Sequence, residues 1–98
     1  MEAIAAAISD PTRRRVLELV RDRELAAGEI AGAFEISRPA VSRHLRVLRE
    51  AGLVYERRDG RLRLYRSRPE PLEELRRWLD AYWSGRLAAL KALAEEER

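Results

Sequence analysis

The sequence has no cysteine among its 98 residues, so it forms no disulfide bond, no thiolate metal site and no thiol redox switch. It has a single histidine, His44, and one imidazole cannot build a transition-metal site. His44 stands two residues from Ser42, so on a helix the two side chains point in different directions. The sequence also has no glycine-rich loop of the kind that binds phosphate, and no pair of acidic residues placed to act together in an active-site cleft. These absences argue against an enzyme, and the sequence implies no cofactor.

Long hydrophobic runs are missing as well. The apolar run that contains residues 4–8 is far shorter than the roughly 20 residues that a membrane-spanning helix needs. A secretion signal has a basic segment, then an apolar segment, then small residues at a cleavage site, and the sequence shows no such order. We therefore expect one soluble cytoplasmic domain, residues 1–98, without membrane insertion.

Acidic and basic residues nearly balance. Charged residues make up 38% of the chain, yet the formal net charge is only +3. Lys91 is the only lysine among the 20 Lys and Arg residues. Because the total charge is small, where the arginines stand indicates function better than how many there are.

Helix signals divide the first half of the chain. Asp10, followed by a proline, predicts a helix start. The buried side of that helix is predicted from its apolar residues: Val16, Leu17, Leu19 and Val20. A short helix over residues 27–34 has no Ser, Thr or Asp cap at its start. Ser37 caps the following helix, which has Pro39 in its first turn and ends at Gly52.

Residues 27–50 are predicted to form a helix-turn-helix. The residues expected to pack its two helices together are Ile30, Phe34, Ile36 and Val41. In the second helix Val41, Leu45 and Leu48 recur at spacings of four and three, which makes one buried stripe. The opposite side of that helix carries Arg38, Ser42, Arg46 and Arg49, with Arg43 near its edge. This pattern suits contacts with the DNA major groove, and a solvated amphipathic helix is the plainer alternative.

A hairpin is predicted over residues 53–66. Its residues alternate around Asp59-Gly60, a strong signal for a two-residue turn. With that turn, Arg58 faces Arg61 and Glu56 faces Arg63. Opposed arginines destabilise a hairpin by up to about 1 kcal/mol, which makes sense if DNA phosphates neutralise them. Simple solvation of the two arginines is the alternative.

The motifs together resemble one family. They are the run DPTRR at residues 10–14, SRPAVSRHLRVL at 37–48, EAGLV at 50–54 and the DG turn. As a set they are similar to the ArsR/SmtB-type bacterial repressors, over about residues 3–66. The resemblance implies a homodimeric winged helix-turn-helix repressor that binds an inverted-repeat DNA operator. The DNA-binding positions that it implies are Ser37, Arg38, Pro39, Ser42, Arg43 and Arg46 of the recognition helix, and Arg58, Arg61 and Arg63 of the wing.

The chain departs from the metal sensors of that family. Those have cysteine pairs in the recognition helix or histidine and carboxylate clusters in the last helix, and this sequence has neither. Glu73 and Asp80 are isolated carboxylates, and His44 is expected to be a half-buried structural residue. The resemblance is therefore to a metal-independent, SdpR-like branch, in which release from DNA comes from a protein or small-molecule inducer that the sequence does not identify.

The last third of the chain predicts one long helix, residues 70–97. Such a helix spans roughly 40 Å, longer than so small a domain covers by itself. With residues 1–9 it is expected to form a dimer interface made by Ile4, Ile8, Leu75, Trp78, Leu79, Tyr82 and Trp83. The alternative is that Trp78 and Trp83 are ordinary core residues. A sharper hypothesis is that Trp78, Tyr82 and Trp83 also border a ligand or partner site.

The fold expected is mainly α with a small β-hairpin: a winged helix-turn-helix with a long C-terminal dimerisation helix. The function expected is a homodimeric, sequence-specific repressor. The alternative from another class is a winged-helix adaptor that binds protein without specific DNA binding. That alternative leaves the arginines of the wing tip unexplained.

Overall fold

The structure is a computed structural model and describes residues 1–96. Within these residues the elements follow in the order α1 (Glu2–Ile8), α2 (Pro11–Leu19), β1 (Leu25–Ala26), α3 (Ala27–Gly32), α4 (Arg38–Glu50), β2 (Val54–Asp59), β3 (Leu62–Ser67) and α5 (Leu72–Glu96). The mainly helical winged helix-turn-helix predicted from the sequence is confirmed.

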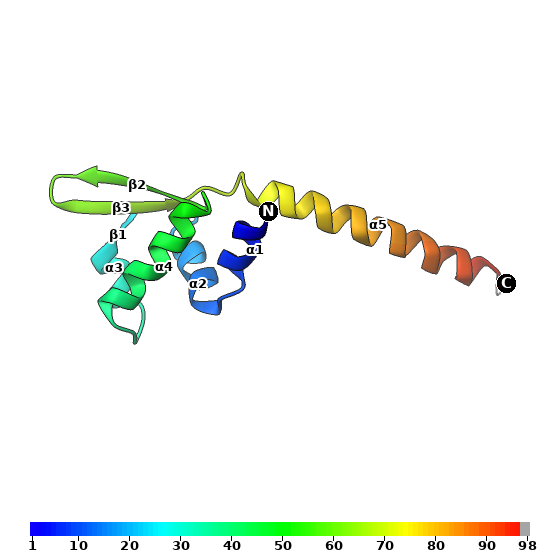
Figure 1. Cartoon of the computed structure of the whole chain (residues 1–98), viewed down its shortest axis with the longest axis horizontal. Coiled ribbons are helices and arrows are strands. Elements are labelled where there is room, and N and C mark those ends of the chain that lie inside the picture. The colour runs from blue at the N-terminus through cyan, green and yellow to red at the C-terminus, as the bar shows by residue number, and fades with distance from the viewer. Residues whose placement is uncertain (97–98) are drawn as a thin grey trace.

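Three parts are visible in Figure 1. Helices α1 to α4 pack together, the hairpin of β2 and β3 extends from one side, and α5 projects from the other. The longest dimension is therefore 66 Å, against 25 and 22 Å for the other two. The radius of gyration is 18.2 Å, whereas a compact chain of about 100 residues has roughly 13 Å. Helix α5 thus leaves the body of its own chain.

The helix caps predicted from the sequence are present. The Asp10 carboxylate accepts the Thr12 and Arg13 backbone N–H groups at 2.8 and 3.1 Å. These bonds lower the pKa of Asp10, and the bond from the Arg13 N–H has the larger effect. Ser37 Oγ accepts the Ala40 N–H at 3.2 Å and so starts the recognition helix α4. Both caps satisfy donors that a helix leaves unpaired at its first turn.

The start of α3 has a cap that the sequence prediction missed. The Ala26 N–H donates to Glu29 Oε1 at 3.0 Å. Glu29 is the third residue of the helix, and a Glu there reaches back to the cap residue in the capping box. The signal was present in the sequence at Glu29, although the cap position itself holds an alanine.

Replacing Ser37 with alanine is expected to lower the free energy of unfolding by about 1 kcal/mol, because the Ala40 N–H loses its partner. Urea unfolding of both proteins measures the change. Ser84→Ala is the matched control, because Ser84 is exposed inside α5 and caps no helix. Equal losses in the two variants would contradict the capping role.

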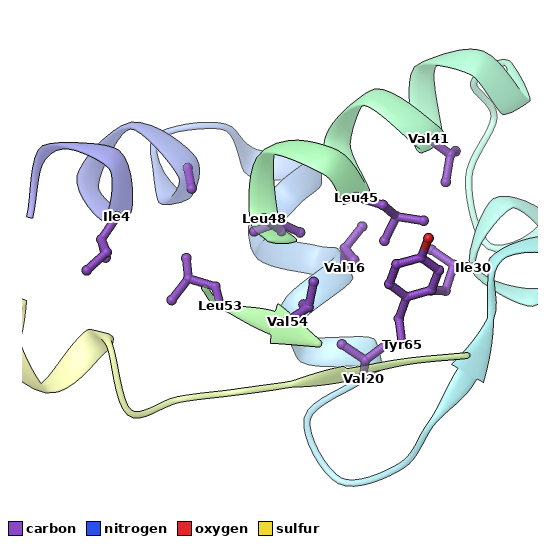
Figure 2. Close-up of a cluster of buried hydrophobic side chains, with 11 residues drawn as sticks. Ile4, Val16, Val20, Ile30, Val41, Leu45, Leu48, Leu53, Val54 and Tyr65 are labelled. Carbon is purple, nitrogen blue, oxygen red and sulfur yellow. The ribbon is translucent and has the colours of Figure 1, made fainter. Parts of the chain in front are cut away.

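The hydrophobic core lies between α1, α2, α3, α4 and the base of the hairpin (Figure 2). The predicted stripe of α4, Val41, Leu45 and Leu48, is buried in it. The other buried members include Val16, Val20, Ile30, Leu53, Val54 and Tyr65. Figure 2 shows the Tyr65 ring beneath α4, close to Ile30. The core therefore fixes the recognition helix against the wing as well as against the other helices.

Two packing predictions differ from the structure. Ile36 was expected between α3 and α4 but is 39% exposed, because it stands in the turn before the Ser37 cap and belongs to neither helix. Ile4 was expected at a dimer interface but is only 7% exposed, and Ile8 is half-buried. Both pack on the core of their own chain, since α1 lies against α2 and α4. Ile4 thus has little surface to offer a second chain.

A third strand was not predicted. The sheet has the order β1-β3-β2 and is antiparallel, with Leu25 opposite Tyr65 and Ala26 opposite Leu64. Two residues are too short for the alternation that marks a strand in sequence. Strand β1 ties the wing to the segment just before α3, so the hairpin is attached to the helix-turn-helix along one edge.

Candidate nucleic-acid interface

The recognition helix α4 buries one side and exposes the other. The residues predicted to contact DNA are all exposed in the structure: Ser37, Arg38, Pro39, Ser42, Arg43 and Arg46. In residues 1–96 no carboxylate lies within 4.0 Å of the guanidinium groups of Arg38, Arg43 or Arg46. Their charges are therefore available to an external anion.

An open groove of about 360 Å³ separates α4 from β3. The residues that line it are Ala27, Arg38, Ser42, Leu45, Arg46, Arg49, Arg63 and Tyr65. Arg38, Arg46 and Arg49 come from the recognition helix and Arg63 comes from the wing. The groove thus brings together arginines of the helix and of the wing that stand 14 to 25 positions apart, and gives one positively charged surface.

The register of the wing differs from the prediction. The structure pairs Asp59 with Leu62 and Arg58 with Arg63, so the two-residue turn is Gly60-Arg61 and not Asp59-Gly60. Gly60 has a φ of 62°, and no residue other than glycine has a positive φ in the described part of the chain. A glycine at the first turn position with an ordinary second residue fits a type II′ turn, whereas a type I′ turn needs positive φ at both.

The shifted register places the wing arginines differently. Arg58 faces Arg63 across the strands, and Arg61 stands at the tip. Glu56 lies opposite Tyr65, not opposite Arg63 as predicted. Because alternate residues of a strand share a face, Arg58 and Arg63 lie on the face of the hairpin that carries Tyr65. A second groove, between the wing and the start of α3, contains Arg38, Arg61 and Arg63.

Glu56 is the acidic centre of this surface. It forms ion pairs with Arg49 Nη1 and, at 3.7 Å, with Arg63 Nε. The Tyr65 hydroxyl donates to its Oε2 at 3.4 Å. Burial, together with the Glu56 charge, raises the pKa of Tyr65. The sequence predicted Arg63 near Glu56 but missed Arg49 and Tyr65, because these partners depend on how α4 packs on the hairpin.

The outer face of the wing has its own ion pair. The Arg57 guanidinium donates to both oxygens of Glu24, at 2.9 and 3.0 Å. This contact lowers the pKa of Glu24 and raises that of Arg57. Glu24 stands in the loop before β1, so the pair braces the hairpin against the body on the side away from Tyr65. Nothing in the sequence pointed to this pairing across 33 residues.

Arg13 joins α1 to the recognition helix. Its guanidinium donates to the Ala7 and Ala6 carbonyls at 2.7 and 3.0 Å. Its Nη1 lies 3.2 Å from His44 Nδ1. His44 is half-buried, as expected, and its contact to Arg13 is structural.

Comparison with known proteins gives the family. Residues 10–56 match the family described as bacterial regulatory protein, arsR family. The chain is 42% identical to the HTH-type transcriptional regulator Rv2034 of Mycobacterium tuberculosis, over 93% of this chain and 85% of that protein. The chain belongs to the ArsR family.

Two other similarities bear on the branch and the fold of this ArsR-family chain. It is 37% identical to the transcriptional repressor SdpR of Bacillus subtilis, over 81% of this chain and 88% of that protein. A solved structure from Mycobacterium bovis is described as a homodimeric winged helix-turn-helix DNA-binding domain of "a possible ArsR-family transcriptional regulator". It matches with a TM-score of 0.67 at 26% identity, covering 85% of this chain and 77% of that one.

The C-terminal helix of this ArsR-family protein exposes a large apolar surface. None of its residues is buried within the protomer. Trp78 is 51% exposed, Tyr82 53% and Trp83 51%, so the tryptophans are not ordinary core residues. The Trp78 and Tyr82 rings stack at 5.7 Å, and Trp83 meets Tyr82 edge-on at 5.7 Å. Monomeric proteins rarely expose apolar patches of this extent.

The aromatic residues begin beside α1. A shallow groove of about 190 Å³ is lined by Met1, Glu2, Ala5, Leu75 and Trp78. Figure 1 shows the N-terminus and α1 beside the start of α5. The two segments predicted to form the dimer interface are therefore adjacent in space.

The described residues, 1–96, contain no cluster of three or more His, Asp or Glu side chains placed to hold a metal ion. Glu73 and Asp80 both bind Arg76 of α5, with Asp80 Oδ2 at 2.8 Å from Arg76 Nη1. The Arg76 contact lowers the pKa of Glu73. In the same residues no helix is long and apolar enough to cross a membrane.

Proposed function

We propose that the protein is a homodimeric transcriptional repressor that binds an inverted-repeat DNA operator through α4 and the wing. The observation that carries the proposal is the single groove that joins Arg38 and Arg46 of the recognition helix to Arg63 of the wing. Such a surface offers hydrogen-bond donors to phosphates and to guanine edges at once. Membership of the ArsR family and similarity to the repressor SdpR support it.

The residues proposed to contact bases are Ser42, Arg43 and Arg46, in the exposed middle of α4. Ser37, Arg38 and Pro39 begin the helix, where the backbone N–H of Arg38 and the helix dipole favour a phosphate. Arg58 and Arg61 of the wing contact the neighbouring DNA backbone, whereas Arg63, which the sequence also predicted to do so, pairs with Glu56. A helix of this kind reads the major groove while the flanking contacts fix its orientation.

The second part of the proposal is the dimer. The exposed apolar side chains of α5 need a partner, and a second copy brings the same surface. Two recognition helices then lie about one DNA turn apart, ~34 Å, as two half-sites require. Repression follows when the dimer covers a promoter, in the cytoplasm where the bacterial chromosome lies. An inducer, either a protein or a small molecule and not a metal ion, releases the DNA, and Trp78, Tyr82 and Trp83 are the residues proposed to border its site.

The test of the proposed function is fluorescence anisotropy with the DNA immediately upstream of the protein's own gene and with an unrelated duplex. The expected result is saturable binding of two chains per upstream duplex, well above the control. Equal binding to the two duplexes would place the operator elsewhere. A complete absence of DNA affinity would reject the proposal and favour the protein-binding adaptor.

The double variant Arg58→Ala, Arg61→Ala is expected to weaken binding to all sequences alike. Both residues are exposed at the end of the wing, where they contact phosphates and not bases. Each phosphate contact contributes about 0.9 to the slope of log affinity against log salt, so the slope becomes flatter by up to about 1.8. Titrations at several salt concentrations measure it, and parallel lines for wild type and variant would rule out the contacts.

A further inference from the structure

The arginines of the interface fall into two groups. In the part of the chain that the structure describes, five of them have no carboxylate within 4.0 Å: Arg38, Arg43, Arg46, Arg58 and Arg61. Arg49 and Arg63 line the same groove but are both paired with Glu56. One acid therefore distinguishes two of the groove's arginines from the others.

Glu56 is well placed to hold these two side chains. Its own side chain is 17% exposed, whereas those of Arg49 and Arg63 are 45% and 54% exposed. The Tyr65 hydroxyl donates to the carboxylate oxygen that also binds Arg49. Tyr65 is buried in the core, so its hydrogen bond holds the Glu56 carboxylate in place. A half-buried ion pair is weakened less by salt and water than a pair on the open surface.

A phosphate has to compete with Glu56 for Arg49 and Arg63. Non-specific binding to DNA comes almost entirely from arginine and lysine contacts with phosphates. Two arginines that stay paired with a carboxylate of the protein add little to this non-specific binding. Base contacts from the middle of α4 are unaffected, because Arg43 and Arg46 carry no such partner. Such a cluster is expected to lower non-specific affinity more than specific affinity.

We propose that Glu56 is a specificity-determining residue, which withholds Arg49 and Arg63 from DNA phosphates and so limits binding to non-operator DNA. The inference rests on the proposed function, since it assumes that the groove faces DNA. It assigns a role to an acid in a surface that otherwise attracts anions.

The experiment compares the full-length wild type with Glu56→Gln, which keeps the size of the side chain and removes its charge. Fluorescence anisotropy with an unrelated duplex over a salt series gives the readout. The expected result is tighter non-specific binding at low salt and a slope steeper by about 1 to 2, as one or two more phosphates are neutralised. The ratio of operator to non-specific affinity falls.

The matched control is Glu24→Gln. Glu24 also pairs with a wing arginine, but Arg57 points to the face away from Tyr65. Loss of the Glu24–Arg57 ion pair is expected to leave the salt slope unchanged. A second background tests the partners: in an Arg49→Ala, Arg63→Ala protein, Glu56→Gln is expected to have no effect on the slope, because the coupling is gone.

Several results would overturn the inference. An unchanged slope for Glu56→Gln means that phosphates already reach both arginines. Weaker binding of Glu56→Gln to the operator and to the unrelated duplex alike means that Glu56 only stabilises the position of the wing. If these occur while the wild type still binds its operator, the proposed function stands and only the role of Glu56 fails. If the wild type itself has no affinity for any duplex, both are rejected.

Discussion

Replacing Tyr82 and Trp83 with glutamate is expected to convert the protein to a monomer and to lower its affinity for an inverted-repeat operator by at least about 100-fold. Both side chains are half exposed in the protomer, so the substitutions leave its own core intact. In the dimer the two charges enter an apolar interface, where an unpaired carboxylate is strongly unfavourable. The two recognition helices then bind their half-sites independently, and the gain from linking them is lost.

Sedimentation velocity measures the mass, and anisotropy on the operator measures the affinity. Arg77→Glu is the matched control, because Arg77 is well exposed on the side of α5 that carries the Glu73 ion pairs. It introduces the same charge into the same helix and is expected to leave a dimer. A Tyr82→Glu, Trp83→Glu protein that stays dimeric, or that binds the operator as tightly as the wild type, would show that α5 does not join the two copies.

Replacing Arg46 with alanine is expected to weaken binding to the preferred operator by roughly 1–3 kcal/mol and to relax the preference at one base pair of each half-site. Arg46 lines the groove from the recognition helix, and among residues 1–96 no carboxylate lies within 4.0 Å of its guanidinium. A guanidinium can form two hydrogen bonds to a guanine edge, whereas alanine can form none. Arg43→Ala is expected to act similarly at a different base pair.

Selection from random duplexes, followed by affinity measurements on the selected sites, tests the role of Arg46. Arg77→Ala removes the same charge from α5 and serves as the control. If Arg46→Ala weakens all duplexes equally and keeps the wild-type preference, Arg46 contacts phosphate and the reading of bases has to be assigned to other side chains.

Local signals in the sequence predicted most of the fold. Asp10 and Ser37 cap their helices through backbone bonds to residues two or three positions away, so the sequence alone contains both partners. The stripe of Val41, Leu45 and Leu48 is a property of one helix, and its burial is confirmed. The hairpin follows from alternation around a glycine. Such features depend on neighbours in the chain and not on the tertiary fold.

The register of the wing shows where local reasoning fails. Asp59-Gly60 and Gly60-Arg61 are both acceptable turns by composition, and a shift of one residue changes every cross-strand pair. The choice is made by burial: Tyr65 has to point into the core beneath α4, and its partner across the strands is Glu56. Which face of the hairpin meets α4 is not determined by the hairpin itself.

The interactions between distant segments could not be predicted either. The pairing of Glu24 with Arg57 and the contact of Arg13 with His44 join residues 33 and 31 positions apart. An arginine-rich surface with many acids has numerous plausible ion pairs, and only the packing of α1, α4 and the wing selects among them. The exposed arginines of α4 were predictable because they lie opposite its buried stripe.

The most direct measurement of the central claim is the stoichiometry and affinity of the complex with an inverted-repeat duplex selected from random DNA. Sedimentation and anisotropy are compared for that duplex and for one in which a single half-site is scrambled. We expect two chains on the intact repeat and a loss of affinity of about 10²-fold or more on the scrambled duplex. Equal affinity for the two duplexes, or one chain per intact repeat, would contradict a dimer that reads two half-sites through α4.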